Sequence, residues 1–171
     1  MVDPETAQYA LEITTLAEME KLGRQLGGLF LPGDVLLLYG GLGAGKTTLT
    51  RALGRGLEVE ERYYISSPSF ALMHEYPGRY PLYHIDCYRL TGEEDVEAAG
   101  LVEYIDTKNG VCVVEWPERL GTLTPEHSLR LEIKIGKEEK RRLLFRAPAS
   151  VWSNRLTPIL DILDGNKTTS G

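Results

Sequence analysis

The chain has 171 residues, of which 42% are hydrophobic and 26% charged, proportions typical of one globular domain with a real core. Its formal net charge of −6 argues against a protein that coats nucleic acid by itself, because such proteins present a basic surface. The polar start MVDPETAQ is not a signal peptide, no apolar run approaches the roughly 20 residues of a membrane span, and Cys87 and Cys112 form no Cys-x-x-Cys pair. We therefore expect a cytoplasmic protein without a membrane segment or a disulfide-linked partner.

The first third of the chain predicts a helix, a strand, a glycine-rich loop and a second helix. Residues 14–30 place apolar side chains on one helical stripe, and Thr15 with Glu18 fits a capping box. Residues 35–38 form a short, wholly apolar strand, which is typical of a sheet covered on both faces. The second helix spans residues 47–57, and two glycines are expected to weaken its end, Gly54 and Gly56.

The middle of the chain has shorter elements. Residues 65–70, ISSPSF, favour a loop, and residues 70–76 and 80–86 predict strands that pair around a Pro-Gly turn. Residues 92–105 predict one helix, whose acidic first turn suits the helix dipole. Residues 111–114 predict a further buried strand that contains a reduced cysteine.

The C-terminal part alternates apolar and polar residues. Residues 128–135 and 140–147 predict an antiparallel hairpin with one face in water. Residues 151–163 predict a last helix interrupted by Pro158, and residues 164–171 a disordered tail. Because there is no repeat or long linker, residues 1–163 are expected to form a single domain. The expected fold is three-layer α/β, with a mostly parallel sheet that the hairpin extends antiparallel.

The strongest motif is YGGLGAGKTTLTR, whose Gly40 to Thr47 match the full phosphate-binding loop pattern Gly-x-x-x-x-Gly-Lys-Thr. Glycines let backbone N–H groups approach a triphosphate, and the following helix presents its positive end. Lys46 is suited to the β- and γ-phosphates and the Thr47 hydroxyl to Mg²⁺. The sequence therefore predicts nucleotide binding by Gly41, Leu42, Gly43, Ala44, Gly45, Lys46, Thr47 and Thr48.

Two acids stand at the ends of predicted strands. Glu115 follows residues 111–114, and Asp86 ends LYHID. Ligands gather at the carboxyl ends of parallel strands, so one acid is expected near the metal and the other near the attacking water. Alternatives stay open: Glu115 is a solvated strand end, or Asp86 is a helix N-cap or the ion-pair partner of Arg89.

Other candidates carry weaker signals. Ser67 and Ser69 are candidates for the γ-phosphate or its water, with a plain turn as the equal alternative. Trp116 packs beside the nucleotide, faces a partner, or belongs to the core. The histidines lack metal-ligand spacing and are read as surface or core residues: His74, His84 and His127. A solvated hairpin is favoured over an RNA or acidic-partner surface for the basic residues Lys137, Lys140, Arg141, Arg142 and Arg146.

Together, LLLYGGLGAGKTTLTRALGRGL, SSPSFALMHEY, LYHIDCYRL and VVEWPERL resemble, in order, the TsaE (YjeE) family of bacterial ATPases. The resemblance implies an ATP hydrolase, weak alone, that uses ATP and Mg²⁺ and works with the TsaB–TsaD complex. That complex makes N6-threonylcarbamoyladenosine at position 37 of tRNAs that read codons beginning with A, so tRNA is reached through the partners. Two positions depart from the family pattern, Ser69 in place of Thr and Cys87 in place of an apolar residue.

The resemblance also assigns roles to residues. Lys46, Asp86 and Glu115 form the catalytic set, with Asp86 needed for hydrolysis and Thr47 and Glu115 at the Mg²⁺. The start of the first helix, at Leu16, is placed near the adenine, and Glu118 at the nucleotide site.

Three other activities remain as alternatives. A small-molecule kinase of this size usually has an arginine-rich lid, and the segment between Asp86 and Glu115 contains no comparable run. A GTPase would need an Asn-Lys-x-Asp segment, which the chain does not contain. A nucleotide-gated adaptor would bind nucleotide without hydrolysing it.

Overall fold

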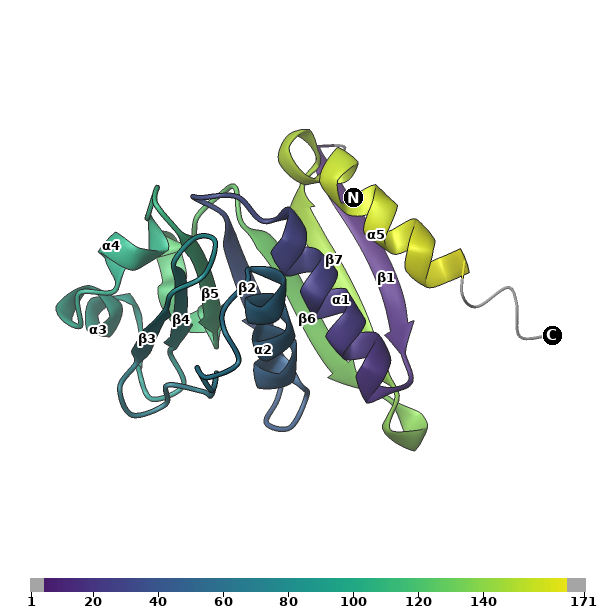
Figure 1. The fold of residues 1–171 in the computed structure, drawn as a ribbon. Coiled ribbons are helices and arrows are strands. Elements are labelled where there is room, and N and C mark those ends of the chain that lie inside the picture. The colour runs from purple at the N-terminus through teal and green to yellow at the C-terminus, as the bar shows by residue number, and fades with distance from the viewer. Residues whose placement is uncertain (1–4, 166–171) are drawn as a thin grey trace.

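The computed structural model describes residues 5–165, which form a seven-stranded mixed sheet in the order β1-β7-β6-β2-β5-β4-β3 (Figure 1). The strands are β1 (Thr6–Ile13), β2 (Val35–Tyr39), β3 (Met73–Tyr76), β4 (Leu82–Asp86), β5 (Val111–Glu115), β6 (Leu129–Ile135) and β7 (Arg141–Pro148). The helices are α1 (Leu16–Leu29), α2 (Lys46–Gly56), α3 (Glu93–Ala98), α4 (Val102–Ile105) and α5 (Ala149–Gly165), with two 3-10 segments, η1 (Pro117–Leu123) and η2 (Lys137–Glu139).

The centre of the sheet is parallel. β6, β2, β5 and β4 run in the same direction. On one side β7 pairs antiparallel with β6 and β1 antiparallel with β7, so β1 again points in the direction of the central strands. On the other side β3 pairs antiparallel with β4. The predicted α/β fold, with a parallel core and an antiparallel C-terminal hairpin, is therefore confirmed. The carboxyl ends of β2, β4 and β5 meet at one edge, where ligands bind in open α/β sheets.

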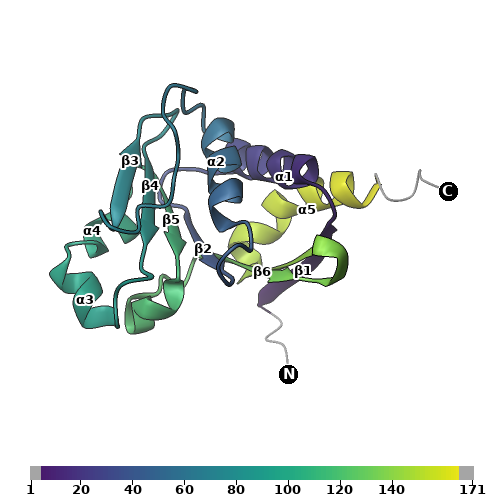
Figure 2. The same cartoon turned by 90° about the horizontal axis from the view of Figure 1, so that it is seen from below.

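Helices cover the sheet on two faces. α1, α2 and α5 lie on one face, and α3 and α4 lie on the other, beside β4 and β5 (Figure 2). The apolar strand β2 serves both layers, because Leu36 and Leu38 join the core under α1 and α2 while Val35 and Leu37 join the opposite core. This double coverage explains why the strand has no polar alternation.

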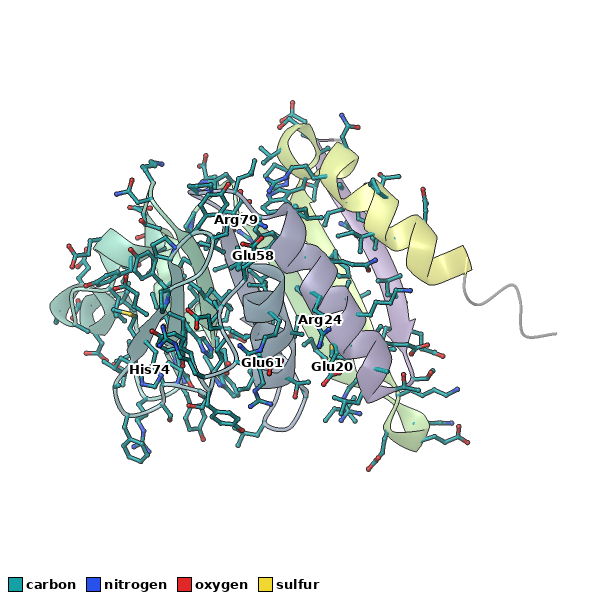
Figure 3. All side chains as sticks on the ribbon, in the orientation of Figure 1. Glu20, Arg24, Glu58, Glu61, His74 and Arg79 are labelled. Atoms are coloured by element: carbon teal, nitrogen blue, oxygen red, sulfur yellow. The ribbon has the colours of Figure 1, made fainter. Side chains whose placement is uncertain are left out.

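α1 and α2 touch through their backbones. A Cβ atom added to Gly27 would lie 2.1 Å from the carbonyl oxygen of Leu53, and one added to Gly56 would lie 2.1 Å from that of Arg24. Gly56 thus permits a close helix crossing at the end that it was expected to weaken. Arg79 lies beside the C-terminal end of α1, as Figure 3 shows, and its Nη2 donates to the carbonyls of Gly27 and Gly28 at 3.1 and 3.2 Å.

α5 is fastened to the loop before β2. Arg155 forms an ion pair with buried Asp34 and lies over the ring of Trp152 at 4.2 Å. The indole Nε1 of Trp152 donates to the carbonyl of His127 at 2.8 Å. We name this group, Asp34, Trp152 and Arg155, the α5 clamp.

Three features differ from the prediction. No element was expected before residue 14, yet residues 6–13 form β1, which pairs along its whole length with β7. The single helix over 92–105 is wrong, because Gly100 adopts a left-handed φ of 70° and separates α3 from α4. The interruption at Pro158 is also wrong: α5 runs through it, held by buried side chains of Trp152, Leu156, Ile159 and Leu160.

Three further observations concern the C-terminal end, the helices and the two cysteines. The tail expected from residue 164 begins within α5, and positions 166–171 lie outside the described residues. Within residues 5–165, no helix has both the length and the apolar character needed to cross a membrane. Cys87 and Cys112 are free and buried, as expected for Cys112, and burial raises the pKa of Cys87 to about 12.

Candidate functional site

The phosphate-binding loop connects the carboxyl end of β2 to the start of α2. Gly45 takes a left-handed φ of 111° at the N-cap of α2, a conformation that favours glycine, and no side chain caps the helix there. The backbone N–H groups of the first turn therefore donate to no capping side chain. Together with the helix dipole, they form a cradle suited to an anion.

Lys46 is buried at the centre of this loop. Its Nζ donates to the carbonyls of Gly40 and Gly41 at 2.7 and 2.8 Å and lies 4.6 Å from the ring centre of Trp116. Burial lowers the pKa of Lys46, against the opposing attraction of the Glu115 and Asp86 carboxylates. The ammonium group thus lies beside the cradle, held by carbonyl oxygens. Within residues 5–165 it forms no ion pair with a carboxylate.

Glu115 lies at the end of β5 with only 3% of its surface exposed, so it is not a solvated strand end. The Thr47 hydroxyl donates to its Oε1 at 3.2 Å, which connects the start of α2 to β5. His84 on β4 approaches the same oxygen, with its Nε2 at 2.8 Å. Thr47 and His84 thus both contact the carboxylate of Glu115. The role of Thr47 and Glu115 at a metal ion stays a prediction.

Asp86 lies beside Glu115, as its register partner across β4 and β5. Its carboxylate accepts a hydrogen bond from the Ser67 hydroxyl and one from the Tyr88 backbone N–H, at 2.8 Å for the latter. Both carboxylate oxygens are thereby fixed in direction. The helix N-cap alternative is wrong, and Arg89 donates to Ser69 at 3.4 Å instead of pairing with Asp86.

Two adjoining pockets surround the loop. One, of about 440 Å³, is lined by residues 42–48 together with Ser67, Ser69, Asp86, Tyr88, Glu115 and Trp116. The other, of about 360 Å³, lies across the loop between the start of α1 and the tip of the β6–β7 hairpin. Leu16, 64% exposed, lines this second pocket, and Gly43, Ala44, Gly45 and Thr48 line both.

Two predicted residues stay apart from the pockets. Gly41 acts through its carbonyl, which accepts from Lys46. Glu118 is exposed in η1 and lines neither of the two pockets, although its charge acts on Lys46. Its direct contact with nucleotide stays a prediction.

Two functional positions were missed because their partners are distant in sequence. Arg141 was grouped with a solvated patch, but its Nε donates to the carbonyl of Ala44 at 3.0 Å and its Nη2 to that of Gly43 at 3.4 Å. The alternation of β7 was the available signal, since it places Arg141 on the core face with Leu143. In the same way, alternation places His84 on the same face of β4 as Asp86.

The donors present fit a magnesium ion that arrives with a nucleotide. No group of three His, Cys, Asp or Glu side chains within residues 5–165 is arranged to hold a metal by itself. Mg²⁺ rarely uses such cages, because phosphate oxygens and water complete its octahedral shell. The Thr47 hydroxyl and the Glu115 carboxylate supply oxygen donors next to the phosphate cradle.

Known proteins are similar to this chain in sequence and in fold. A family model described as threonylcarbamoyl adenosine biosynthesis protein TsaE matches residues 13–143. The chain is 38% identical over 131 residues to the tRNA threonylcarbamoyladenosine biosynthesis protein TsaE of Bacillus subtilis. The matched residues cover 76% of this chain and 80% of that protein. The TsaE protein of Streptomyces coelicolor is 44% identical over 118 residues, 67% and 78% of the two chains. The crystal structure of Bacillus subtilis YdiB superposes with a TM-score of 0.76 at 31% identity, covering 93% of this chain and 97% of that one.

Proposed function

The chain belongs to the TsaE family, and from that membership we propose that it is the Mg²⁺-dependent ATPase subunit that supports a TsaB–TsaD complex. The family acts in tRNA threonylcarbamoyladenosine biosynthesis, and so does this chain. The proposed product is N6-threonylcarbamoyladenosine at position 37 of tRNAs that read codons beginning with A. We further propose that the chain works in the cytoplasm and meets tRNA only through its partners.

The observation that carries the ATPase proposal is the contact between Thr47 and Glu115. The Thr47 hydroxyl stands at the first turn of α2, and its hydrogen bond to Glu115 brings a strand-end carboxylate to the phosphate cradle. Bound Mg²⁺ would neutralise phosphate charge, and Thr47 with Glu115 would hold it there. A loop that only bound phosphate would not need a buried acid at this point.

Lys46 and Asp86 have different duties in the proposal. Lys46 would leave the Gly40 and Gly41 carbonyls and bind the β- and γ-phosphates with the backbone N–H groups of the loop. Asp86, held by Ser67 and Tyr88, presents a fixed carboxylate that can accept a proton from an attacking water. Ser69, on the same pocket wall, would contact the γ-phosphate or that water.

The second pocket suits the nucleoside end of ATP. It adjoins the phosphate cradle through four shared residues, and the exposed side chain of Leu16 offers an apolar surface to a base. Arg141 fixes the loop carbonyls between the two pockets. Glu118 remains a candidate contact in the same proposal.

The test is steady-state ATP turnover with purified TsaB and TsaD. We expect slow turnover alone and stimulation by the two partners, lost in Lys46→Ala. Glu115→Ala should impair Mg²⁺-dependent turnover more than nucleotide binding. If TsaB and TsaD cause no stimulation, the ATPase-subunit proposal is wrong.

A nucleotide-gated adaptor would behave differently in the same experiment. Lys46→Ala and Glu115→Ala would then both abolish assembly with the partners, and turnover would be absent throughout. Phosphate transfer to nucleosides or sugars would instead indicate a kinase.

A further inference from the structure

His84 is a fully buried histidine, and within residues 5–165 its ring makes a single polar contact, with Glu115 at the phosphate site. Its side chain is 0% exposed, and its Nε2 lies 2.8 Å from Oε1 of Glu115. It comes from β4 and reaches Glu115 on β5, where its own register partner is Val113. A histidine placed only to fill the core would not need to face a carboxylate.

The second ring nitrogen identifies the tautomer. Nδ1 of His84 is buried and has no hydrogen-bond partner within residues 5–165. A proton on that nitrogen would be a buried donor without an acceptor, which costs more than an unpaired lone pair in an aromatic ring. A carboxylate oxygen only accepts, so the ring nitrogen 2.8 Å from it carries a proton, and Nε2 of His84 donates to Glu115.

This donor restricts how the Glu115 carboxylate can lie. Oε1 accepts from His84 at 2.8 Å and from the Thr47 hydroxyl at 3.2 Å, so both hydrogen bonds converge on one oxygen. A hydroxyl that donates its proton to Oε1 turns its lone pairs away from the carboxylate. Those lone pairs are the electrons that Thr47 would offer to a cation at the cradle.

We propose that His84 is a positioning residue for the divalent-cation site: it holds Glu115 so that Glu115 orients the Thr47 hydroxyl. This inference rests on the proposed role of Thr47 and Glu115 in holding Mg²⁺. His84 touches neither nucleotide nor cation in this arrangement, and its effect passes through Glu115. Loss of a residue that hydrogen-bonds a metal ligand typically lowers metal affinity by roughly 10- to 100-fold.

The chain offers two informative substitutions and a matched control. His84→Leu introduces an apolar side chain of similar bulk and removes the donor, whereas His84→Gln keeps an N–H the same number of bonds from Cα as Nε2. His74 is the register partner of His84 on β3, at the edge of the sheet (Figure 3), and its Nδ1 contacts the Tyr76 hydroxyl at 3.2 Å. His74→Gln therefore changes a neighbouring histidine that does not contact Glu115.

The experiment measures Mn²⁺ binding to the full chain in the presence of ADP, by electron paramagnetic resonance of free Mn²⁺. ADP affinity in EDTA and the thermal midpoint are measured beside it. We expect His84→Leu to lose roughly 10- to 100-fold in Mn²⁺ affinity with ADP affinity in EDTA retained. His84→Gln should recover most of the loss, and His74→Gln should match the parent.

The outcomes separate this inference from the proposed function. Parent-like Mn²⁺ affinity in His84→Leu overturns the positioning role. Equal losses in folded His84→Leu and His84→Gln also overturn it, because a donor would then not be what matters. If His84→Leu fails to fold, His84→Met, another apolar side chain without a donor, takes its place: a tenfold or greater loss of Mn²⁺ affinity supports the role, and parent-like affinity overturns it. A parent chain whose ADP binding brings no Mn²⁺ site contradicts the proposed function itself.

Discussion

The two ends of β2 bury charge in different ways. At its carboxyl end, Lys46, Asp86 and Glu115 converge on a pocket, and Lys46 is held by carbonyls and an aromatic ring. At its start, Asp34 is closed into an ion pair with Arg155 and also accepts from the Leu31 backbone N–H at 2.7 Å. The charged groups at the carboxyl end line a pocket, whereas the charge of Asp34 is paired within the protein.

The difference separates binding from stability. A buried charge without a paired counter-charge is unfavourable for folding, and such groups are typical of functional sites. A buried pair with hydrogen bonds to each partner is costly to break, because one charge is then left alone. Substitutions at the two ends of β2 should therefore affect different measurements.

The largest effect is expected for Asp86→Asn. It removes the carboxylate that would accept a proton from water, so ATP turnover with TsaB and TsaD should fall by about 10²- to 10⁴-fold. ADP affinity and the free energy of unfolding should change little, and Asp161→Asn, at an exposed position of α5, should match the parent. A parallel loss of affinity and turnover would show that Asp86 serves binding instead.

Arg155→Gln should have the opposite profile. Loss of the cation leaves Asp34 buried without its counter-charge, so we expect the free energy of unfolding to fall by about 1.5–3 kcal/mol in urea titrations. Turnover per folded molecule should be retained. Arg62→Gln is the matched control, since the Arg62–Glu60 pair has side chains 69% and 64% exposed and should contribute less than about 1 kcal/mol.

Gly27→Ala tests whether the two ends of β2 are independent. The new Cβ would collide with the Leu53 carbonyl, and we expect a loss of about 1–3 kcal/mol in unfolding free energy. Because α1 begins at the second pocket and ends near Asp34, ADP affinity should fall as well. Gly28→Ala has open space around the new Cβ and should stabilise by about 0.5–1 kcal/mol. Loss of stability with unchanged ADP affinity would indicate that the ends act separately.

The smallest effect concerns an exposed charge. Glu93 accepts from the backbone N–H and hydroxyl of Thr122 at 2.7 and 2.8 Å, and these hydrogen bonds lower the pKa of Glu93 below its ordinary 4.5. Because the pKa of Glu93 is lower in the folded than in the unfolded state, its ionisation stabilises the folded state at pH values above the unfolded pKa. This contribution is lost as the pH falls through the folded pKa. Thr122→Val should therefore raise the pKa of Glu93 in an NMR titration and lower stability at neutral pH but not in strong acid.

Thr124→Val provides the control for that titration. Its hydroxyl donates to the carbonyl of Gly121 in the same turn and does not contact Glu93. A similar pKa change in both variants would mean that the turn, not the Thr122 hydroxyl, sets the acidity of Glu93.

Local patterns predicted the parts of the site that depend on neighbours in sequence. The loop from Gly40 to Thr47 is recognisable because each residue type serves the cradle directly. Glu115 and Asp86 were found because apolar runs predict strands, and parallel strands bring their carboxyl ends together. The separation of α3 from α4 at Gly100 also depends on a local signal. The prediction of one helix over residues 92–105 missed it because apolar periodicity on both sides was given more weight than the glycine.

Contacts between distant segments could not be predicted in this way. His84 needs the register of β4 and β5, and Arg141 needs the β6–β7 hairpin to fold back on the loop. The α5 clamp includes a hydrogen bond between Arg155 and Asp34, which are 121 residues apart in the sequence. One-dimensional alternation indicates which face a side chain takes, but not which side chain from another strand or helix it will meet.

Arg141 has a consequence for the order in which the chain is made. It stands 97 residues after Ala44, whose carbonyl it holds, so a growing chain carries the complete phosphate-loop sequence long before this contact can form. β1 must likewise wait for β7, its partner in the sheet. Closing such distant contacts is slow in folding. The proposed competence to bind nucleotide should consequently appear only after β7 has left the ribosome.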